Sequence, residues 1–308
     1  MGKKYIKLPS NDGVHTLNVV AWLPDIEIKA VLQISHGMIE MIERYEDFAL
    51  YLNKSGFAVY GNDHLGHGKT AGKDEDLGYF CPENMSAIVI EDLHSVTKYA
   101  KSKHSDVPYF LLGHSMGSFM ARRYLMTYGD ELTAAIICGT GRQPKVRLIL
   151  AKLIANIQKV FTSDRHRSKL MKKLAFGHYL DKIDNPRTPS DWLTRDEKIV
   201  DFCLENKYCN FEFTINGYRT LFDVLTFIQK DENISKIPTN LPIFFIAGDA
   251  DPVGEYAKGV KDVYNKYRAA GISDIDIKLY PQDRHEILNE LDREIVYEDA
   301  LNWLESKM

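Results

Sequence analysis

A serine framed by two glycines is the feature of this sequence with the clearest chemical meaning. Ser115 lies between Gly113 and Gly117 in the stretch "FLLGHSMGSFM". This G-x-S-x-G pattern is typical of a nucleophile elbow, a sharp turn between a strand and a helix that raises the serine hydroxyl above a sheet. A side chain at either glycine position would collide with the neighbouring strand or helix. We therefore interpret Ser115 as a nucleophile.

A serine hydroxyl becomes an effective nucleophile when a base takes its proton and a carboxylate orients that base. In proteins with this elbow the chain order is serine, acid, histidine. Three of the ten histidines follow Ser115, namely His166, His178 and His285. The first two fall inside a basic helical segment, whereas His285 lies in the loop "PQDRH" after a predicted strand. His285 is therefore the predicted base.

The acid of this arrangement should follow a late strand of the sheet. The stretch "IFFIAGDADPVG" offers Asp249 and Asp251. We favour Asp251, which directly precedes Pro252 where the loop turns over the sheet edge, and we expect Asp249 to form hydrogen bonds within the turn. Asp283, two residues before the predicted base, is interpreted as a loop-capping or solvated residue. The predicted catalytic residues are Ser115, Asp251 and His285.

Backbone N–H groups must also stabilise the negative charge that develops on the substrate oxygen. Met116 follows the nucleophile and supplies one predicted donor, while the second is Met38, in the loop "SHGMIEMIERY". Gly37 allows this loop to turn tightly. Such a mechanism uses no metal and no organic cofactor, and none is predicted. Asp63, His64 and His67 are expected to hold their own loop by hydrogen bonds, and His114 to pack or hydrogen-bond beneath the elbow.

Alternating strand and helix patterns must position these residues. Two early runs look like an antiparallel pair joined by the turn signal Asn11-Asp12-Gly13. Short apolar or β-branched runs follow, separated by helical patterns, as expected for βαβ units in a largely parallel sheet. The predicted strands are "AVLQIS", "FAVYGN", "PYFLL", "TAAIIC", "LPIFFIAG" and "DIDIKLY". The fold class is therefore α/β, with a mostly parallel central sheet flanked by helices.

The alternation stops near residue 141. Residues 142–235 have the pattern of consecutive helices interrupted by turn signals such as "DNPRTPSD". We therefore divide the chain into a first core part at 1–141, a helical cap or lid at 142–235, and a second core part at 236–308.

The beginning of the insertion is strongly basic, with eleven Lys or Arg against two acidic residues in 141–183. Within "PKVRLILAKLIANIQKVF", three lysines and an asparagine share one helical face and aliphatic residues cover the rest. One interpretation is a lid helix that is buried on one face and solvated on the other. The alternative is a basic amphipathic surface that makes transient contact with anionic lipid or an anionic head group.

Composition narrows the class of protein further. The 308 residues carry a formal net charge of −4, which gives no reason to expect nucleic-acid binding. The first residues have no signal-peptide pattern, and no apolar run is long enough to span a bilayer. The four cysteines, Cys81, Cys138, Cys203 and Cys209, lack metal-type spacing and are expected to be reduced thiols in core or half-buried positions. We expect a soluble cytoplasmic protein.

Four motifs in order resemble the monoglyceride lipase and lysophospholipase group of α/β-hydrolases, which are serine aminopeptidase-like hydrolases. They are "HGMIEMIERYEDFALYLNKSGFAVYGNDHLGHGKT", "GHSMGS", "GDADPV" and "DRHEI". The resemblance implies a serine hydrolase with a helical cap that acts on carboxylic esters, often monoacylglycerols or lysophospholipids. Carried onto matching positions, it implies the triad Ser115, Asp251 and His285 and the oxyanion-hole donors Met38 and Met116.

One departure from this group concerns the substrate. Many members carry a histidine after the glutamate of the first motif, whereas here Met41 follows Glu40. Because that position borders the acyl or leaving-group site, the detailed substrate stays open while the chemistry does not change.

Two other functions are compatible with the same residues. An amidase or aminopeptidase would use the same triad. A substrate with a free α-amine would need acidic partners in the cap, where segment 141–183 is basic but later segments such as "TRDEKIVDFCLEN" contain acids. A small-ligand receptor that keeps a hydrolase pocket without turnover is the third hypothesis. Labelling by a fluorophosphonate together with multi-turnover kinetics separates these possibilities.

Overall fold

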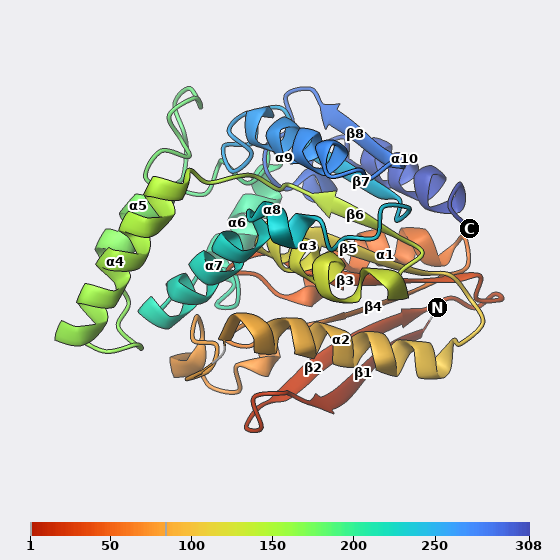
Figure 1. Cartoon of the computed structure of the whole chain (residues 1–308), viewed down its shortest axis with the longest axis horizontal. Coiled ribbons are helices and arrows are strands. Elements are labelled where there is room, and N and C mark those ends of the chain that lie inside the picture. The colour runs from red at the N-terminus through yellow and green to blue at the C-terminus, as the bar shows by residue number, and fades with distance from the viewer. Residues whose placement is uncertain (1, 84) are drawn as a thin grey trace.

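The computed structural model describes residues 2–83 and 85–308 and contains an eight-stranded sheet (Figure 1). The strand order is β1-β2-β4-β3-β5-β6-β7-β8. The first two neighbouring pairs, β1 with β2 and β2 with β4, are antiparallel, and all later neighbours are parallel. The strands are β1 (Gly2–Pro9), β2 (Thr16–Leu23), β3 (Ala30–Ser35), β4 (Phe57–Asn62), β5 (Tyr109–His114), β6 (Ala134–Cys138), β7 (Ile243–Gly248) and β8 (Ile275–Tyr280).

Helices cover both faces of this sheet, which confirms the predicted fold class. One face packs against α1 (Glu46–Asn53) and α10 (Arg293–Glu305), and the other against α2 (Met85–Lys103), α3 (Met116–Tyr128) and α9 (Lys258–Ala269). Short 3-10 helices complete the core: η1 (Ile42–Tyr45), η2 (Gly68–Thr70), η3 (Asp74–Asp76), η4 (Gly129–Glu131) and η5 (Ile287–Asn289).

The central strands are buried along their whole length because helices lie on both sides of them. Every residue of β3, β4, β5, β6 and β7 is buried, and these strands are rich in aliphatic and aromatic side chains. The edge strand β8 instead alternates half-buried and exposed residues. The carboxyl ends of parallel strands meet at one edge of a sheet, where ligand sites form in folds of this type. The loops after β3, β5, β7 and β8 carry the predicted site residues.

The chain between β6 and β7 is largely helical. It contains α4 (Lys145–Phe161), α5 (Lys169–Phe176), α6 (Glu197–Glu205), α7 (Ile215–Ile228) and α8 (Asp231–Ile234). Figure 1 shows α4 and α5 standing out from the body of the molecule, while α7 runs close to the core. Residues 177–196 form turns without a helix, and this stretch contains the turn signal "DNPRTPSD".

The four cysteines are free thiols, as predicted, with Cys209 half-buried and the other three buried. Among the described residues, no helix combines the length and the apolar character needed to cross a membrane.

Candidate active site

Ser115 stands between the end of β5 and the start of α3 in a strained backbone conformation. Its φ is 54° and its ψ is −122°, a region that residues with a side chain seldom occupy. The flanking glycines make this turn possible. A Cβ on Gly113 would come 2.4 Å from the carbonyl oxygen of Gly117, and a Cβ on Gly117 would come 1.9 Å from the carbonyl oxygen of Ser35. The local geometry is therefore that of a nucleophile elbow, with no room for a methyl group at either glycine.

Asp251 and His285 meet as a buried pair. Asp251 follows β7 and His285 follows β8, and His285 Nδ1 lies 2.9 Å from Asp251 Oδ1. Asp251 is fully buried and His285 is 2% exposed. The N–H of Val253 donates to the same carboxylate oxygen and fixes its orientation. Since a carboxylate only accepts, Nδ1 carries the proton when His285 is neutral, and Nε2 is then the basic atom.

The ring of His285 lies beside the residue that precedes Ser115. The centroids of the His114 and His285 rings are 4.9 Å apart, and His114 Nε2 lies 3.2 Å from the carbonyl oxygen of His285. His285 Nε2 is buried and has no hydrogen-bond partner among residues 2–83 and 85–308, so no hydrogen bond joins it to Ser115 in this structure. The structure thus brings Asp251 and His285 into contact and places the base next to the elbow.

The loop after β3 approaches the elbow from the other side. A Cβ on Gly37 would lie 3.1 Å from Ser115 Cβ, so the backbone next to Met38 passes directly over the serine. The Gly37 N–H donates to Glu40, which holds the turn closed. Met116 is the first residue of α3, where N–H groups have no partner within the helix. The two predicted donors therefore come from segments that flank Ser115.

The other polar residues singled out in the sequence hold loops. Asp249 accepts from the Gln282 N–H at 2.7 Å, so it bonds within the turn as expected. Asp63 accepts from the N–H groups of Ile42 and Lys69, and His67 Nδ1 lies 2.9 Å from the Leu65 carbonyl oxygen.

Two further histidines and Asp283 complete the sequence-based candidates. His166 and His178 are exposed on the insertion, which agrees with their exclusion as candidates for the catalytic base. Asp283 is fully buried and paired with Arg195, so it is not a solvated residue. Asp283, Glu290 and Asp292 form a carboxylate group close enough to share an ion, but the Arg195 guanidinium already contacts all three.

Sequence reasoning missed the residues that hold the His285 loop. Trp192 of the insertion packs on His285 with ring centroids 5.1 Å apart, and the Glu286 N–H donates to the Leu193 carbonyl oxygen at 2.7 Å. Arg44 forms a two-pronged ion pair with Glu286 across 242 positions of sequence. The only available signal was the position of Glu286 beside the predicted base.

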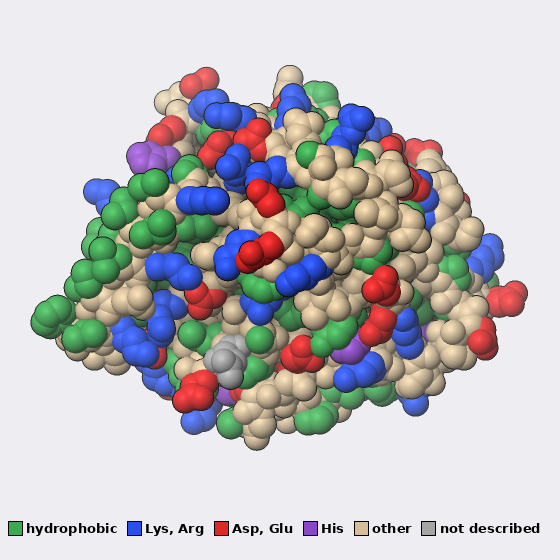
Figure 2. Space-filling view, in the orientation of Figure 1, with side chains coloured by type: hydrophobic (Ala, Val, Ile, Leu, Met, Phe, Trp, Pro, Cys, Tyr) green, Lys and Arg blue, Asp and Glu red, His purple; other side chains and the backbone are tan. Residues whose placement is uncertain are grey.

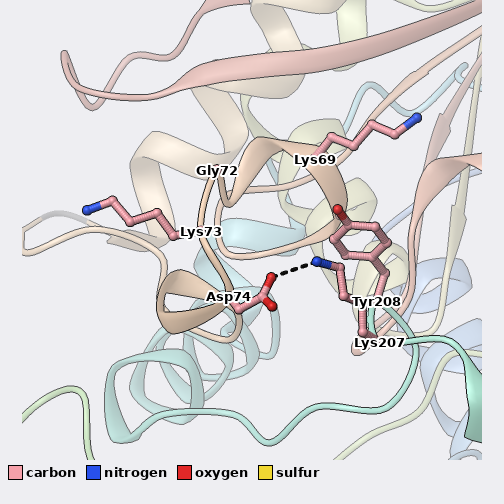
Figure 3. A pocket seen from close by; sticks show the side chains of 7 residues that line it. Lys69, Gly72, Lys73, Asp74, Lys207 and Tyr208 are labelled. Atoms are coloured by element: carbon pink, nitrogen blue, oxygen red, sulfur yellow. Dashed lines mark hydrogen bonds and ion pairs between the residues drawn. The ribbon is translucent and has the colours of Figure 1, made fainter.

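A surface pocket of about 250 Å³ lies elsewhere and is lined by Gly68, Lys69, Gly72, Lys73, Asp74, Lys207 and Tyr208. Figure 3 shows that Lys69 and Lys73 point away from each other, while Lys207 pairs with Asp74 at 2.8 Å. Its cations do not converge on one point, and none of the predicted catalytic residues lines it.

The sheet order, the strained serine and the buried Asp–His pair define the class of α/β-hydrolases. A family model described as serine aminopeptidase, S33, matches residues 26–292, and the chain belongs to this family. The resemblance noted in the sequence is thereby confirmed.

Known proteins align with nearly the whole chain. It is 25% identical over 302 residues to a monoacylglycerol lipase of Mycolicibacterium smegmatis, covering 96% of each chain. A thermostable carboxyl esterase from Bacillus coagulans, solved in complex with glycerol, is 31% identical, has a TM-score of 0.92 and is covered over 99% of both chains. A monoglyceride lipase variant from Saccharomyces cerevisiae, solved with a substrate analogue, shares the fold with a TM-score of 0.78 at 20% identity, over 99% of this chain and 95% of that one.

Proposed function

We propose that Ser115, His285 and Asp251 form the catalytic triad of a serine hydrolase that cleaves monoacylglycerol or lysophospholipid esters. The chain is a carboxylic ester hydrolase by its family and its lipase and esterase relatives. The main observation that supports the triad is the buried contact between Asp251 and His285. This contact lies at the sheet edge where Ser115 adopts its strained backbone conformation. A glycerol ester is proposed as the substrate because relatives are named monoacylglycerol lipase and monoglyceride lipase.

The geometry supports an acyl-enzyme mechanism. His285 Nε2, the unprotonated ring atom, takes the proton of Ser115 Oγ as the oxygen attacks the ester carbonyl. The N–H groups of Met38 and Met116 donate to the oxyanion, and the imidazolium returns its proton to the leaving alcohol. Water then attacks the acyl-enzyme by the same route. Asp251 keeps the ring oriented and stabilises its charged form throughout.

We further propose that residues 142–235 act as the cap over this site and that α4 touches a lipid surface. Large apolar side chains form a stripe along α4 and are 48–82% exposed: Val146, Ile149, Leu150, Leu153, Ile157, Val160 and Phe161. Figure 2 shows hydrophobic side chains gathered at the left edge of the molecule, where α4 lies in Figure 1. Only Leu148 and Ala155 of this helix are buried.

This exposure changes the interpretation of the helix. The helix α4 is not a lid helix whose aliphatic face is buried, because its exposed face is apolar. Part of the positive charge is already neutralised, since Lys152 pairs with Asp223 and Lys159 with Asp164. The apolar stripe is therefore a stronger argument for lipid contact than the basic charge. The cytoplasmic location expected from the sequence stays a prediction.

The experiment that tests the triad compares Ser115→Ala with Ser102→Ala, an exposed serine on α2. Turnover of p-nitrophenyl acyl esters should fall by a factor on the order of 10⁶ in the first variant and stay unchanged in the second. A fluorophosphonate should label the wild type and Ser102→Ala but not Ser115→Ala. Full activity of Ser115→Ala would refute the triad.

A substrate panel separates the remaining alternatives. Esters of different acyl length with glycerol or choline head groups should be cleaved faster than aminoacyl amides. Faster cleavage of the amides would assign an aminopeptidase instead. Covalent labelling without multiple turnovers would indicate the ligand receptor.

A further inference from the structure

Four ionisable side chains are buried together beneath the elbow. Glu40, Arg44, His114 and Glu286 are each at most 6% exposed at the side chain. Glu40 and Arg44 belong to the segment that follows the oxyanion loop, His114 precedes the nucleophile, and Glu286 follows the base. The group therefore connects three of the four segments that carry the proposed catalytic machinery, although the reaction itself uses none of the four side chains.

The charges of this group balance only when His114 is protonated. Arg44 Nη1 lies 2.9 Å from Glu40 Oε2 and 2.8 Å from Glu286 Oε1, so one guanidinium serves two carboxylates. The second carboxylate is left without a permanent cation. A buried charge without a partner is strongly unfavourable, and His114 is the remaining group in contact that can supply a positive charge. Its Nδ1 lies 3.4 Å from Glu40 Oε1.

The hydrogen-bond partners of His114 require a proton on both ring nitrogens. Nε2 faces the carbonyl oxygen of His285 at 3.2 Å, and a carbonyl oxygen only accepts. Nδ1 faces the Tyr45 hydroxyl at 3.0 Å. The single proton of that hydroxyl is directed to Glu40 Oε1 at 2.9 Å, so its oxygen accepts from Nδ1–H. A neutral imidazole would leave one of these contacts without a hydrogen.

We propose that His114 is a positioning residue, held as an imidazolium by Glu40, that fixes the backbone of the base by donating from Nε2 to the His285 carbonyl oxygen. This inference rests on the proposed function, because it gives His285 the role of base. Electrostatics agree with it. Burial alone would lower the pKa of His114, but the hydrogen bond and the charge of Glu40 outweigh burial and raise the pKa above its ordinary value.

The cation on His114 also acts on the base. The two rings are 4.9 Å apart, so a charge on His114 disfavours a second charge on His285. Asp251 faces His285 from the opposite loop and opposes this effect, while the uncharged Trp192 covers its ring. The ionisable groups that face His114 are Glu40, Tyr45, Glu286, His285 and His36.

Two readouts test this proposal. The first is the protonation state of His114, observed by NMR of ¹⁵N-histidine in the Ser115→Ala protein, which needs no turnover. At about pH 6.5, where an ordinary histidine is half protonated, both ring nitrogens of His114 should carry a proton. Glu40→Gln should remove one of them while the Gln oxygen still accepts from the Gly37 N–H. A His114 ring with a single proton at pH 6 would overturn the proposal, whatever the outcome for the triad.

The second readout is the pH profile of kcat/KM. His114→Gln keeps an amide donor but removes the cation, so the acidic limb of the profile should move upward by about 1 pH unit. The matched control is His94→Gln on α2, where the imidazole pairs with Glu131 far from the elbow, and its profile should match the wild type. A His114→Gln enzyme that loses activity without any shift of the limb would show a merely structural role. If Ser115→Ala retained activity, the triad would fail separately.

Discussion

The indole of Trp192 packs against the imidazole of His285, with ring centroids 5.1 Å apart. Trp192 belongs to the non-helical stretch of the insertion, and its carbonyl oxygen accepts from the His285 N–H at 3.4 Å. The insertion therefore contacts the proposed base directly and does more than cover the site. Tyr179 extends this aromatic contact, with its ring 4.7 Å from that of Trp192.

Replacing Trp192 by Ala should lower kcat by about tenfold to a hundredfold, because the base loses the ring that limits its rotation. Trp192→Phe should recover most of this loss. Trp303→Ala is the control, since Trp303 stacks on Phe244 at the opposite face of the sheet. Steady-state kinetics with a soluble ester measures the effect. Equal losses in Trp192→Ala and Trp303→Ala would contradict a specific role of Trp192.

Asp251→Asn should reduce kcat by about 10⁴, because an amide oriented by the Val253 N–H no longer stabilises the imidazolium of His285. Asp249→Asn is matched in chemistry and lies two residues away, where it bonds only within the turn to Gln282. Its kcat should stay within a factor of about three. The comparison of kcat for the two variants decides between the acids. A larger loss in Asp249→Asn would reassign the acid.

Stability should depend on pH through Asp283. Burial, followed by the charges of Glu290 and Asp292, raises the pKa of Asp283 to about 7. The folded state thus holds this proton more tightly than the unfolded chain, whose ordinary aspartate pKa is about 3.9. The cost of ionising Asp283 appears as the pH rises from about 4 to about 7 and is complete above that window.

Asp283→Asn removes this cost and keeps an oxygen for Arg195. The variant should match the wild type near pH 4 and melt about 2–4 °C higher at pH 8. Thermal unfolding followed by circular dichroism at both pH values measures the difference. Asp130→Asn, at an exposed position after α3, should show no such dependence. A variant that is less stable at pH 8 than at pH 4, relative to the wild type, would contradict the raised pKa.

If α4 contacts lipid, charged substitutions in its apolar stripe should reduce vesicle binding and leave the hydrolysis of a soluble ester unchanged. The double variant Ile149→Asp, Val160→Asp places two charges in the apolar stripe. Its co-sedimentation with phosphatidylcholine–phosphatidylglycerol vesicles should fall at least tenfold, whereas its kcat/KM on a soluble short-chain ester should be unchanged. Val14→Asp, at a 79% exposed apolar residue of the β1–β2 turn, is the control. Unchanged binding of the double variant would exclude this face.

The order of the candidate triad could be predicted because parallel strands bring their carboxyl ends to one edge. Ser115, Asp251 and His285 each follow an apolar run, so strand periodicity alone places them together. The helix α9 was missed, although Val260, Val263 and Tyr267 repeat at helical spacing. Its flanking segment has three residues with positive φ, Glu255, Tyr256 and Ala257, which turn signals did not indicate.

Long-range partners could not be predicted in the same way. Arg44 and Glu286 form their ion pair only because the loops after β3 and β8 meet in space, and no local pattern connects them. The turn signal "DNPRTPSD" indicates a loop within residues 177–196, but no local pattern shows that this loop places Trp192 against His285. The apolar face of α4 was visible as amphipathicity, but periodicity does not reveal whether such a face is covered.

The contacts of segment 191–196 with the His285 loop set a condition for exchanging parts between relatives. Arg284 donates to the carbonyl oxygens of Asp191 and Thr194, and Arg195 binds the carboxylates of Asp283 and Glu290. A chimera that receives a foreign insertion would lose these contacts unless the recipient's own 191–196 were retained. The helices α4 and α5 can therefore be exchanged separately, whereas segment 191–196 must stay with its own core because it holds the His285 loop.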